Sequence, residues 1–292
     1  TAVGSVSLFV NTTGASNVAV GQEALRYNTT ASNNTAVGYQ ALVANTTGAN
    51  NVAIGKDALD SNTTGANNVA IGVDALQSNT TADSNTAVGH SALGANTTAG
   101  GNVAVGYLAM QDSTTAANAT AVGYEALANN TTSNGNHAFG FRALKACTTG
   151  SGNTAVGGSA GTAITTGTAN TVVGASALTA NTTGANNVAV GDSSGAAVTT
   201  GSHNTCIGQD SGNGGVAITT GTGNSLLGTF SHTSAAGDNY ANGIGYDINA
   251  EGGYTTVGKG TDDIRAAHGN VTWATVSDQR YKKDIVDSTA GL

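Results

Sequence analysis

Short apolar runs recur along this chain at a constant interval. Each run is a tripeptide such as Val-Ala-Val or Val-Ala-Ile followed by a glycine, and the glycines are seventeen residues apart through twelve consecutive steps. A fixed period of this length is the sequence signature of a repeat architecture. The glycines are Gly4, Gly21, Gly38, Gly55, Gly72, Gly89, Gly106, Gly123, Gly140, Gly157, Gly174, Gly191 and Gly208.

The pattern within one unit predicts a strand-and-turn coil. Seventeen residues are too few for a helix pair, whereas β-branched runs bounded by Gly and Asn are typical of short strands. The chain has no proline, a residue that would remove a hydrogen-bond donor from a stacked ladder. We therefore expect an all-β fold, a parallel β-solenoid or β-roll of seventeen-residue coils with two strands and two turns per coil. Its coils gain their stability from stacking.

Side-chain alternation in a strand predicts which columns face inward. The Val or Ile before the glycine and the Val or Thr two residues earlier share one face, and we expect them to fill the coil while the Ala between them points outward. The Ala-Leu pair after the glycine cannot both face inward in a strand, so we expect the leucines to contact a partner chain. An apolar stripe on the outside of this length predicts a homo-oligomer. The interface candidates are Leu25, Leu42, Leu59, Leu76 and Leu93.

Asparagine occupies two columns of the repeat. The first lies four residues before the glycine, and we expect it to form hydrogen-bonded ladders along the stack; Ala119 interrupts it. Its first members are Asn17, Asn34, Asn51, Asn68, Asn85 and Asn102. The second column opens Asn-Thr-Thr and also matches the glycosylation acceptor pattern, which we regard as a by-product of the Thr-Thr repeat. It comprises Asn11, Asn28, Asn45, Asn62, Asn79, Asn96, Asn130 and Asn181.

Composition and charge exclude several classes of function. The net charge is −8 and no Lys/Arg cluster is present, so we expect no binding to nucleic acid or anionic membranes. No apolar run approaches the length of a bilayer span, and we expect no membrane insertion. Cys147 and Cys206 occupy different repeat positions, which disfavours a disulfide. The five histidines lack metal-ligand spacing, so we expect no metal and no cofactor.

Two further columns invite functional interpretations. Flat threonine arrays can order water, but ice binding needs threonines at i and i+2 on one face, and adjacent strand residues point to opposite faces. The position after the glycine carries Tyr39, Tyr107, Tyr124 and Phe141. These aromatic rings are candidates for stacking on sugars, and a scattered set of surface aromatics is the preferred interpretation.

The repeat changes character toward its end. Residues 1–228 form the predicted repeat shaft, with a second type of coil from Gly157 onward and a twenty-residue step between Gly208 and Gly228. Residues 229–268 are a less regular β transition region. Residues 269–292 form a connector and the start of a C-terminal domain.

The unit "NNVAIG" resembles the head repeats of trimeric autotransporter adhesins of the YadA type. Those repeats fold as left-handed parallel β-rolls, with three chains side by side. The resemblance covers roughly residues 1–228 and implies a left-handed coil and a homotrimer. Similar units occur in virus fibres as well as in bacterial adhesins.

The last sixteen residues, "SDQRYKKDIVDSTAGL", resemble the opening of the self-cleaving intramolecular chaperone domain at the C-terminus of phage tail spikes and fibres. The matching residues are Ser277, Asp278, Arg280, Lys282 and Ile285. The resemblance implies cleavage between Ser277 and Asp278, with Ser277 as the nucleophile and Lys282 assisting it. A lysine with a lowered pKa can act as the base that a serine hydroxyl needs.

These observations predict a structural protein. We expect a trimeric viral tail fibre, extracellular on the virion surface, that attaches to a host-surface receptor or glycan. We expect no enzyme activity beyond a single self-cleavage. A bacterial cell-surface trimeric adhesin is the main alternative, and an ice-binding solenoid is a third.

Overall fold

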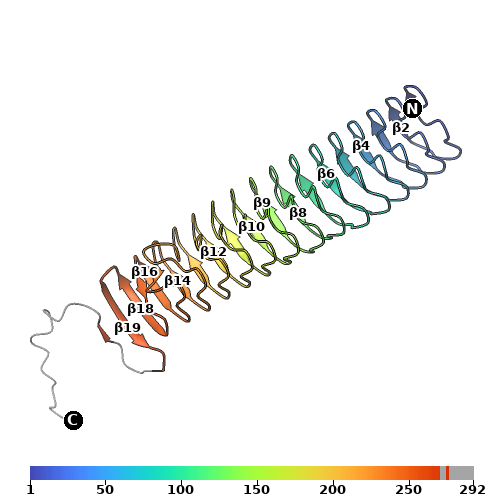
Figure 1. Ribbon diagram of the computed structural model, residues 1–292. Coiled ribbons are helices and arrows are strands. Elements are labelled where there is room, and N and C mark those ends of the chain that lie inside the picture. The colour runs from blue at the N-terminus through green and yellow to red at the C-terminus, as the bar shows by residue number, and fades with distance from the viewer. Residues whose placement is uncertain (270–273, 276–292) are drawn as a thin grey trace, which may run out of the picture.

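The computed structural model describes residues 1–269 and 274–275. Over these residues the chain is a rod-shaped parallel β-solenoid of about 15 turns with roughly 17 residues per coil, and it contains no helix (Figure 1). The predicted all-β parallel solenoid of seventeen-residue coils is therefore confirmed. Successive strands lie side by side like rungs along one wall of the rod.

Each coil contributes one strand of three residues, not the two strands expected from the pattern. In-register pairing joins each strand to the next one period later, as Val52 pairs with Val69. The chain starts with β1 (Ala2–Val3). The regular strands that follow are β2 (Val18–Val20), β3 (Thr35–Val37), β4 (Val52–Ile54), β5 (Val69–Ile71), β6 (Thr86–Val88), β7 (Val103–Val105), β8 (Thr120–Val122), β9 (His137–Phe139), β10 (Thr154–Val156), β11 (Thr171–Val173), β12 (Val188–Val190), β13 (Thr205–Ile207) and β14 (Ser225–Leu227).

Parallel pairing continues past residue 228. Strand β14 pairs with β16 (Asn242–Tyr246), and β16 pairs with β18 (Tyr254–Lys259), both in parallel. The direction then reverses, because β18 pairs antiparallel with β19 (Asp262–Ala267), and β19 pairs antiparallel with β20 (Ala274–Thr275). The short strands β15 (His232–Thr233) and β17 (Asn249–Ala250) form a separate two-stranded sheet. A hairpin thus follows the last parallel strand of the stack.

The middle residue of each strand faces the interior, and its two neighbours face outward. In β4, Ala53 is fully buried whereas Ile54 is 39% exposed. The expectation that Val and Ile fill the coil while Ala points outward is therefore wrong. The cause is the narrow coil: a leucine reaches across from the opposite wall, which leaves room on the strand side for little more than a methyl group.

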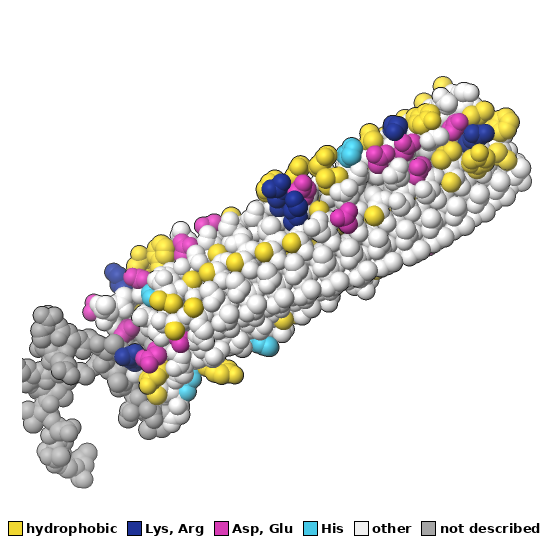
Figure 2. Space-filling view, in the orientation of Figure 1, with side chains coloured by type: hydrophobic (Ala, Val, Ile, Leu, Met, Phe, Trp, Pro, Cys, Tyr) yellow, Lys and Arg dark blue, Asp and Glu magenta, His cyan; other side chains and the backbone are white. Residues whose placement is uncertain are grey.

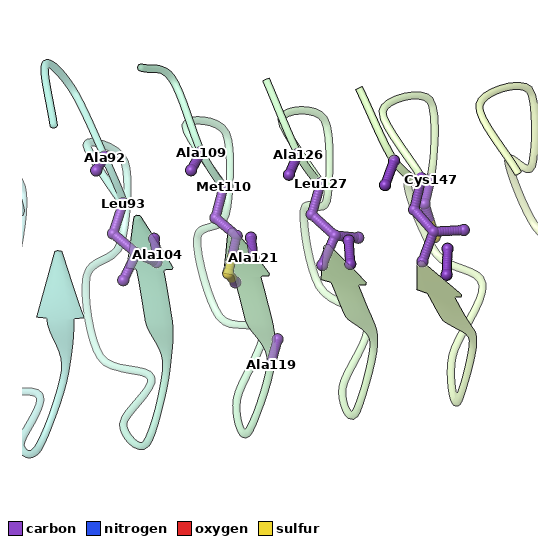
Figure 3. Close-up of a cluster of buried hydrophobic side chains, with 14 of the residues drawn as sticks. Ala92, Leu93, Ala104, Ala109, Met110, Ala119, Ala121, Ala126, Leu127 and Cys147 are labelled. Carbon is purple, nitrogen blue, oxygen red and sulfur yellow. The ribbon is translucent and has the colours of Figure 1, made fainter. Parts of the chain in front are cut away.

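The leucine column supplies most of this core, so the prediction that it contacts a partner chain is also wrong. The five interface candidates, all completely buried, are Leu25, Leu42, Leu59, Leu76 and Leu93. In the middle of the rod, Leu93 and Met110 point toward Ala104 and Ala121 of the strands opposite (Figure 3). The interior is thus a stack of Leu-against-Ala contacts.

The backbone explains why Ala and Leu of one pair can both face inward. Asp74 and Leu76 have positive φ angles of 57° and 51°, and Ala75 between them does not. This alternation recurs in coil after coil and is not a strand conformation, so side chains do not alternate between two faces with a period of two. Ala75 and Leu76 are accordingly both buried.

Candidate interaction surfaces

The outer side of the strand wall is an apolar surface that runs along the rod. We define the strand face as the first and third residues of β2–β14, whose side chains point away from the core. Several third residues are well exposed, among them Ile71 at 37%, Phe139 at 40% and Leu227 at 50%. The full third column is Val20, Val37, Ile54, Ile71, Val88, Val105, Val122, Phe139, Val156, Val173, Val190, Ile207 and Leu227.

The strand face contains no Asp, Glu, Lys or Arg, and its one titratable side chain is that of His137 in β9. Its first-residue column holds mainly Val and Thr. Toward the C-terminal end the face deepens into a shallow groove lined by Ile207, Leu227, Ile244 and Thr255. A contiguous uncharged stripe of this length has the character of an interface.

Sequence reasoning placed this face inside the coil, although one signal pointed outward. The third-residue column accepts Val, Ile, Phe139 and Leu227, a range of volumes that a narrow core would not tolerate. The column between them varies less: it holds Ala in ten of the thirteen strands β2–β14, and the exceptions, Val172, Cys206 and Leu226, all lie from β11 onward. Tolerance of size is thus the sequence signal that separates the outside column from the inside column.

The predicted asparagine ladder of the first column is present as hydrogen bonds. Where the preceding coil also has an asparagine at this position, the backbone N–H donates to its Oδ1, as Asn34 does to Asn17 at 2.9 Å. Each Nδ2 also donates to a backbone carbonyl of the next coil, as Asn51 does to Gly65 at 2.8 Å. The hydrogen-bonding groups of these side chains therefore join neighbouring coils and are not available to a ligand. The buried members of the predicted set are Asn17, Asn34, Asn51, Asn68, Asn85 and Asn102.

The Asn-Thr-Thr column lies inside the coil as well. Nδ2 of Asn62 donates to Oδ1 of Asn45 at 2.9 Å, which makes a second ladder of side-chain amides. In the folded coil a completely buried side-chain amide is inaccessible to a glycan. The completely buried members are Asn28, Asn45, Asn62, Asn79, Asn96, Asn130 and Asn181, and Asn11 of the first coil is half-buried.

The threonine pairs lie in bends of the chain, not in strands. The first hydroxyl of a pair is used between coils, since Thr63 Oγ1 donates to the carbonyl of Thr80 at 3.1 Å. The second threonine, such as Thr64, is exposed. The rod therefore presents one rank of free threonine hydroxyls and not the double rank that an ice-binding face would need.

Four rings in the column after the glycine form one continuous stack. The centroids of His90 and Tyr107 are 5.4 Å apart, those of Tyr107 and Tyr124 5.2 Å, and those of Tyr124 and Phe141 5.5 Å, with planes inclined by 25°, 13° and 18°. We call these residues the aromatic stack. The three larger rings are 41–50% exposed. The rings from His90 to Phe141 are therefore regularly stacked and not scattered, whereas Tyr39 is not part of the stack.

An ion-pair cluster lies beside the aromatic stack. Glu125 accepts hydrogen bonds from Nε of Arg142 at 2.8 Å and lies 2.6 Å from Nζ of Lys145. The hydrogen bond from Lys145, followed by the one from Arg142, holds the pKa of Glu125 below its usual value. Figure 2 shows these basic side chains gathered midway along the rod. Glu125 offsets one of the two positive charges, so the cluster keeps a net charge of +1.

The remaining candidate chemistry is limited in the described part of the chain. Cys147 and Cys206 are free, buried thiols, and burial raises their pKa to about 11 and about 12. Among residues 1–269, no group of three or more His, Cys, Asp or Glu side chains is arranged to hold a metal ion. No helix long and apolar enough to cross a membrane occurs in the described residues.

The predicted self-cleavage residues Ser277, Asp278 and Lys282 lie outside the described residues. Their roles remain those implied by the resemblance of the last sixteen residues.

Comparison of the chain with protein-family models, with curated proteins and with solved structures found no match. Its function is therefore inferred from the surfaces above and from the sequence.

Proposed function

We propose that this protein is the shaft of a trimeric fibre, in which three copies of the solenoid pack side by side and in parallel. The assembled rod is extracellular, on a virion surface, and attaches the particle to a receptor or glycan of a host cell. The observation that carries the proposal is the uncharged strand face, which runs along thirteen successive coils. The left-handed coil and the threefold assembly follow from the resemblance to adhesin head repeats.

A second copy of the same chain is the occupant that fits this face. Coils recur at the spacing of paired strands, about 4.8 Å, and any partner covering the whole face must present complementary groups at that interval. A parallel copy offers the same interval over the same length, with one apolar residue per coil. Small contacts of Val and Ile then add up along the rod, because burial of apolar area is roughly additive.

Parallel alignment also suits an attachment fibre. It brings the same end of all three chains to the same end of the rod, so that the predicted chaperone segments that begin at Ser277 meet. A closed threefold arrangement uses each strand face against its neighbours and leaves no unpaired copy to extend into a filament.

The experiment compares the oligomeric state of the full chain with that of two matched variants. Ile71→Lys, on the strand face, places a charge in the proposed interface. Val73→Lys places the same charge two residues away, on a different surface, at a residue of similar exposure (39% against 37%). Light scattering coupled to size-exclusion chromatography is expected to give a trimer for the wild type and Val73→Lys, and smaller species for Ile71→Lys.

A monomeric wild-type chain would contradict the proposal. The self-cleavage that belongs to it is measured separately by intact mass. The full-length gene product is expected to yield a shaft ending at Ser277, and Ser277→Ala is expected to remain uncut. Adhesion of the trimer to host cells tests the attachment role.

A further inference from the structure

At the repeat position after the glycine, the side chains become small beyond the aromatic stack. Phe141 is followed, coil by coil, by Gly158, Ala175 and Asp192. A Cβ atom built on Gly158 would meet no heavy atom within 4 Å. Two successive coils therefore lack a bulky side chain in a column whose other members include Tyr, Lys, His and Phe. We call this gap, with Phe141 at one end and Asp192 at the other, the notch.

One end of the notch is an aromatic ring with a free face. Phe141 is 50% exposed, and Tyr124 covers the face that points to the N-terminal side. The guanidinium carbon of Arg142 lies 4.8 Å from the centroid of Phe141 and 5.9 Å from that of Tyr124. Since those centroids are 5.5 Å apart, Arg142 lies beside the two rings and not over the far face of Phe141. That face opens onto Gly158.

The rest of the notch is polar. Ser159 and Ser176 directly follow Gly158 and Ala175, the two small residues of the notch, and both are half-buried. A serine hydroxyl both donates and accepts hydrogen bonds. At the far end the exposed carboxylate of Asp192 lies three coils from Phe141, which corresponds to about 14 Å along the rod.

We propose that the notch binds one or two rings of a neutral pyranose glycan. The apolar C–H face of a sugar ring lies on the free face of Phe141, and its hydroxyls bond to Ser159, Ser176 and Asp192. The two open coils provide about 10 Å of length along the rod for it. An aromatic wall with a few placed polar groups is the usual composition of a small-ligand site.

Charge selects a neutral sugar over an acidic one. Arg142 and Lys145 share the single carboxylate of Glu125, which leaves one net positive charge beside Phe141, and the carboxylate of Asp192 at the far end of the notch offsets it. The site as a whole therefore has no net charge, which suits a neutral sugar better than a uronic or sialic acid with its additional carboxylate. A nucleic acid is disfavoured for the same reason, because its phosphates need an electropositive track.

The proposal deepens the proposed function, on which its biological meaning rests, since it assigns a glycan-binding site to the fibre. The two use different surfaces. The strand face is made by residues before the glycine, and the notch is made by residues after it. The notch can therefore bind sugar whether or not the chains have assembled.

The test uses the full chain on an array of neutral and acidic oligosaccharides, followed by titration of the best neutral ligand. Gly158→Leu fills the notch, at a position without positive φ where other coils carry larger side chains. Phe141→Ala removes the wall, and Tyr39→Ala is the control in the same column. We expect both notch variants to weaken binding at least tenfold, Asp192→Asn to weaken it several-fold, and the control to bind like the wild type.

The outcomes separate the two proposals. Failure of the wild type to bind any neutral glycan, or unchanged binding by Gly158→Leu, overturns the notch even if the chain is trimeric and adheres to cells. Binding confined to acidic glycans also overturns it. A monomeric chain that binds neutral sugar and loses binding on Gly158→Leu supports the notch while contradicting the trimeric fibre.

Discussion

The backbone N–H of Asn68 donates to Oδ1 of Asn51 across a distance of 2.9 Å, in a coil interior where both residues are completely buried. Asn51 also donates from Nδ2 to the carbonyl of Gly65. One side chain thus satisfies two backbone groups of the following coil. Buried backbone groups must be paired, so the asparagine column is what allows the coil to turn without orphaned donors or acceptors.

Asn51→Ala is expected to destabilise the rod locally. It leaves the buried N–H of Asn68 without its partner, at a cost of about 1–3 kcal/mol, whereas the carbonyl of Gly65 keeps the hydrogen bond from Nδ2 of Asn62. Thermal unfolding followed by circular dichroism is expected to show a lowered Tm. Thr47→Ala, at an exposed position of the same coil, is the control and is expected to leave Tm nearly unchanged. An equal Tm for Asn51→Ala and the control would refute the role assigned to the ladder.

The other asparagine column contains a defect that can be repaired. Both Nδ2 and Oδ1 of Asn181 are buried and have no hydrogen-bond partner within the described residues. Its neighbours in the column are Ile164 and Val198, both completely buried and apolar. The amide is therefore isolated where the ladder has been replaced by hydrocarbon.

Asn181→Val is accordingly expected to stabilise the protein, by roughly 1–3 kcal/mol, because it removes an unpaired polar group from the core. Asn62→Val makes the same chemical change inside an intact ladder and is expected to destabilise. Urea unfolding of the two variants measures the change in the free energy of unfolding relative to the wild type, which is expected to be positive for Asn181→Val and negative for Asn62→Val. If both substitutions shift the midpoint in the same direction, the isolation of Asn181 is not what distinguishes the sites.

The sequence was sufficient for the architecture because the seventeen-residue period and the β-branched runs leave few alternatives. The prediction of which side chains face the interior was wrong, and one backbone feature accounts for the error in the leucine column. Leu76 has a positive φ of 51°, a conformation uncommon for any residue except glycine, and nothing in its chemical identity announces it. Applying strand alternation to Ala75 and Leu76 therefore sent the leucine outward.

The candidate surfaces, too, were predictable from the sequence only in part. The aromatic column was visible in the sequence, since Tyr107 and Tyr124 share a repeat position, but their mutual stacking depends on coil spacing and rotamer. The small residues at Gly158 and Ala175 are also visible in the sequence. Only the structure shows that the free face of Phe141 lies beside them, and this placement is what makes the notch a candidate site.

Glycine at the end of each strand is expected to be irreplaceable. Gly72 has a φ of +138°, and a Cβ atom there would lie 2.4 Å from the carbonyl oxygen of Gly89 in the next coil. Gly72→Ala combines this overlap with a strained backbone, and we expect a loss of at least about 3 kcal/mol. Gly158→Ala, where a Cβ meets nothing, is the matched control. The free energy of unfolding from urea titration decides, and equal values for the two variants would contradict the close approach of successive coils.

Alkaline pH is expected to destabilise the rod through its two buried thiols. Burial raises the pKa of Cys206 to about 12, from an ordinary value of 9.0. The folded state therefore keeps a proton that the unfolded chain releases. This contribution is fully present below pH 9 and is lost as the pH rises from about 9 toward 12. By pH 11 the loss of stability amounts to roughly 3 kcal/mol, since each pKa unit is worth about 1.4 kcal/mol.

Cys206→Ala tests this directly, because alanine is the usual residue at that position of the strand and fills the same inward site. The variant is expected to lose less stability than the wild type between pH 8 and pH 11 when unfolding by urea is measured at both values. Other groups that titrate in this range, tyrosines included, are common to the two proteins and cancel in the difference. Equal losses would show that Cys206 does not remain protonated in the folded coil.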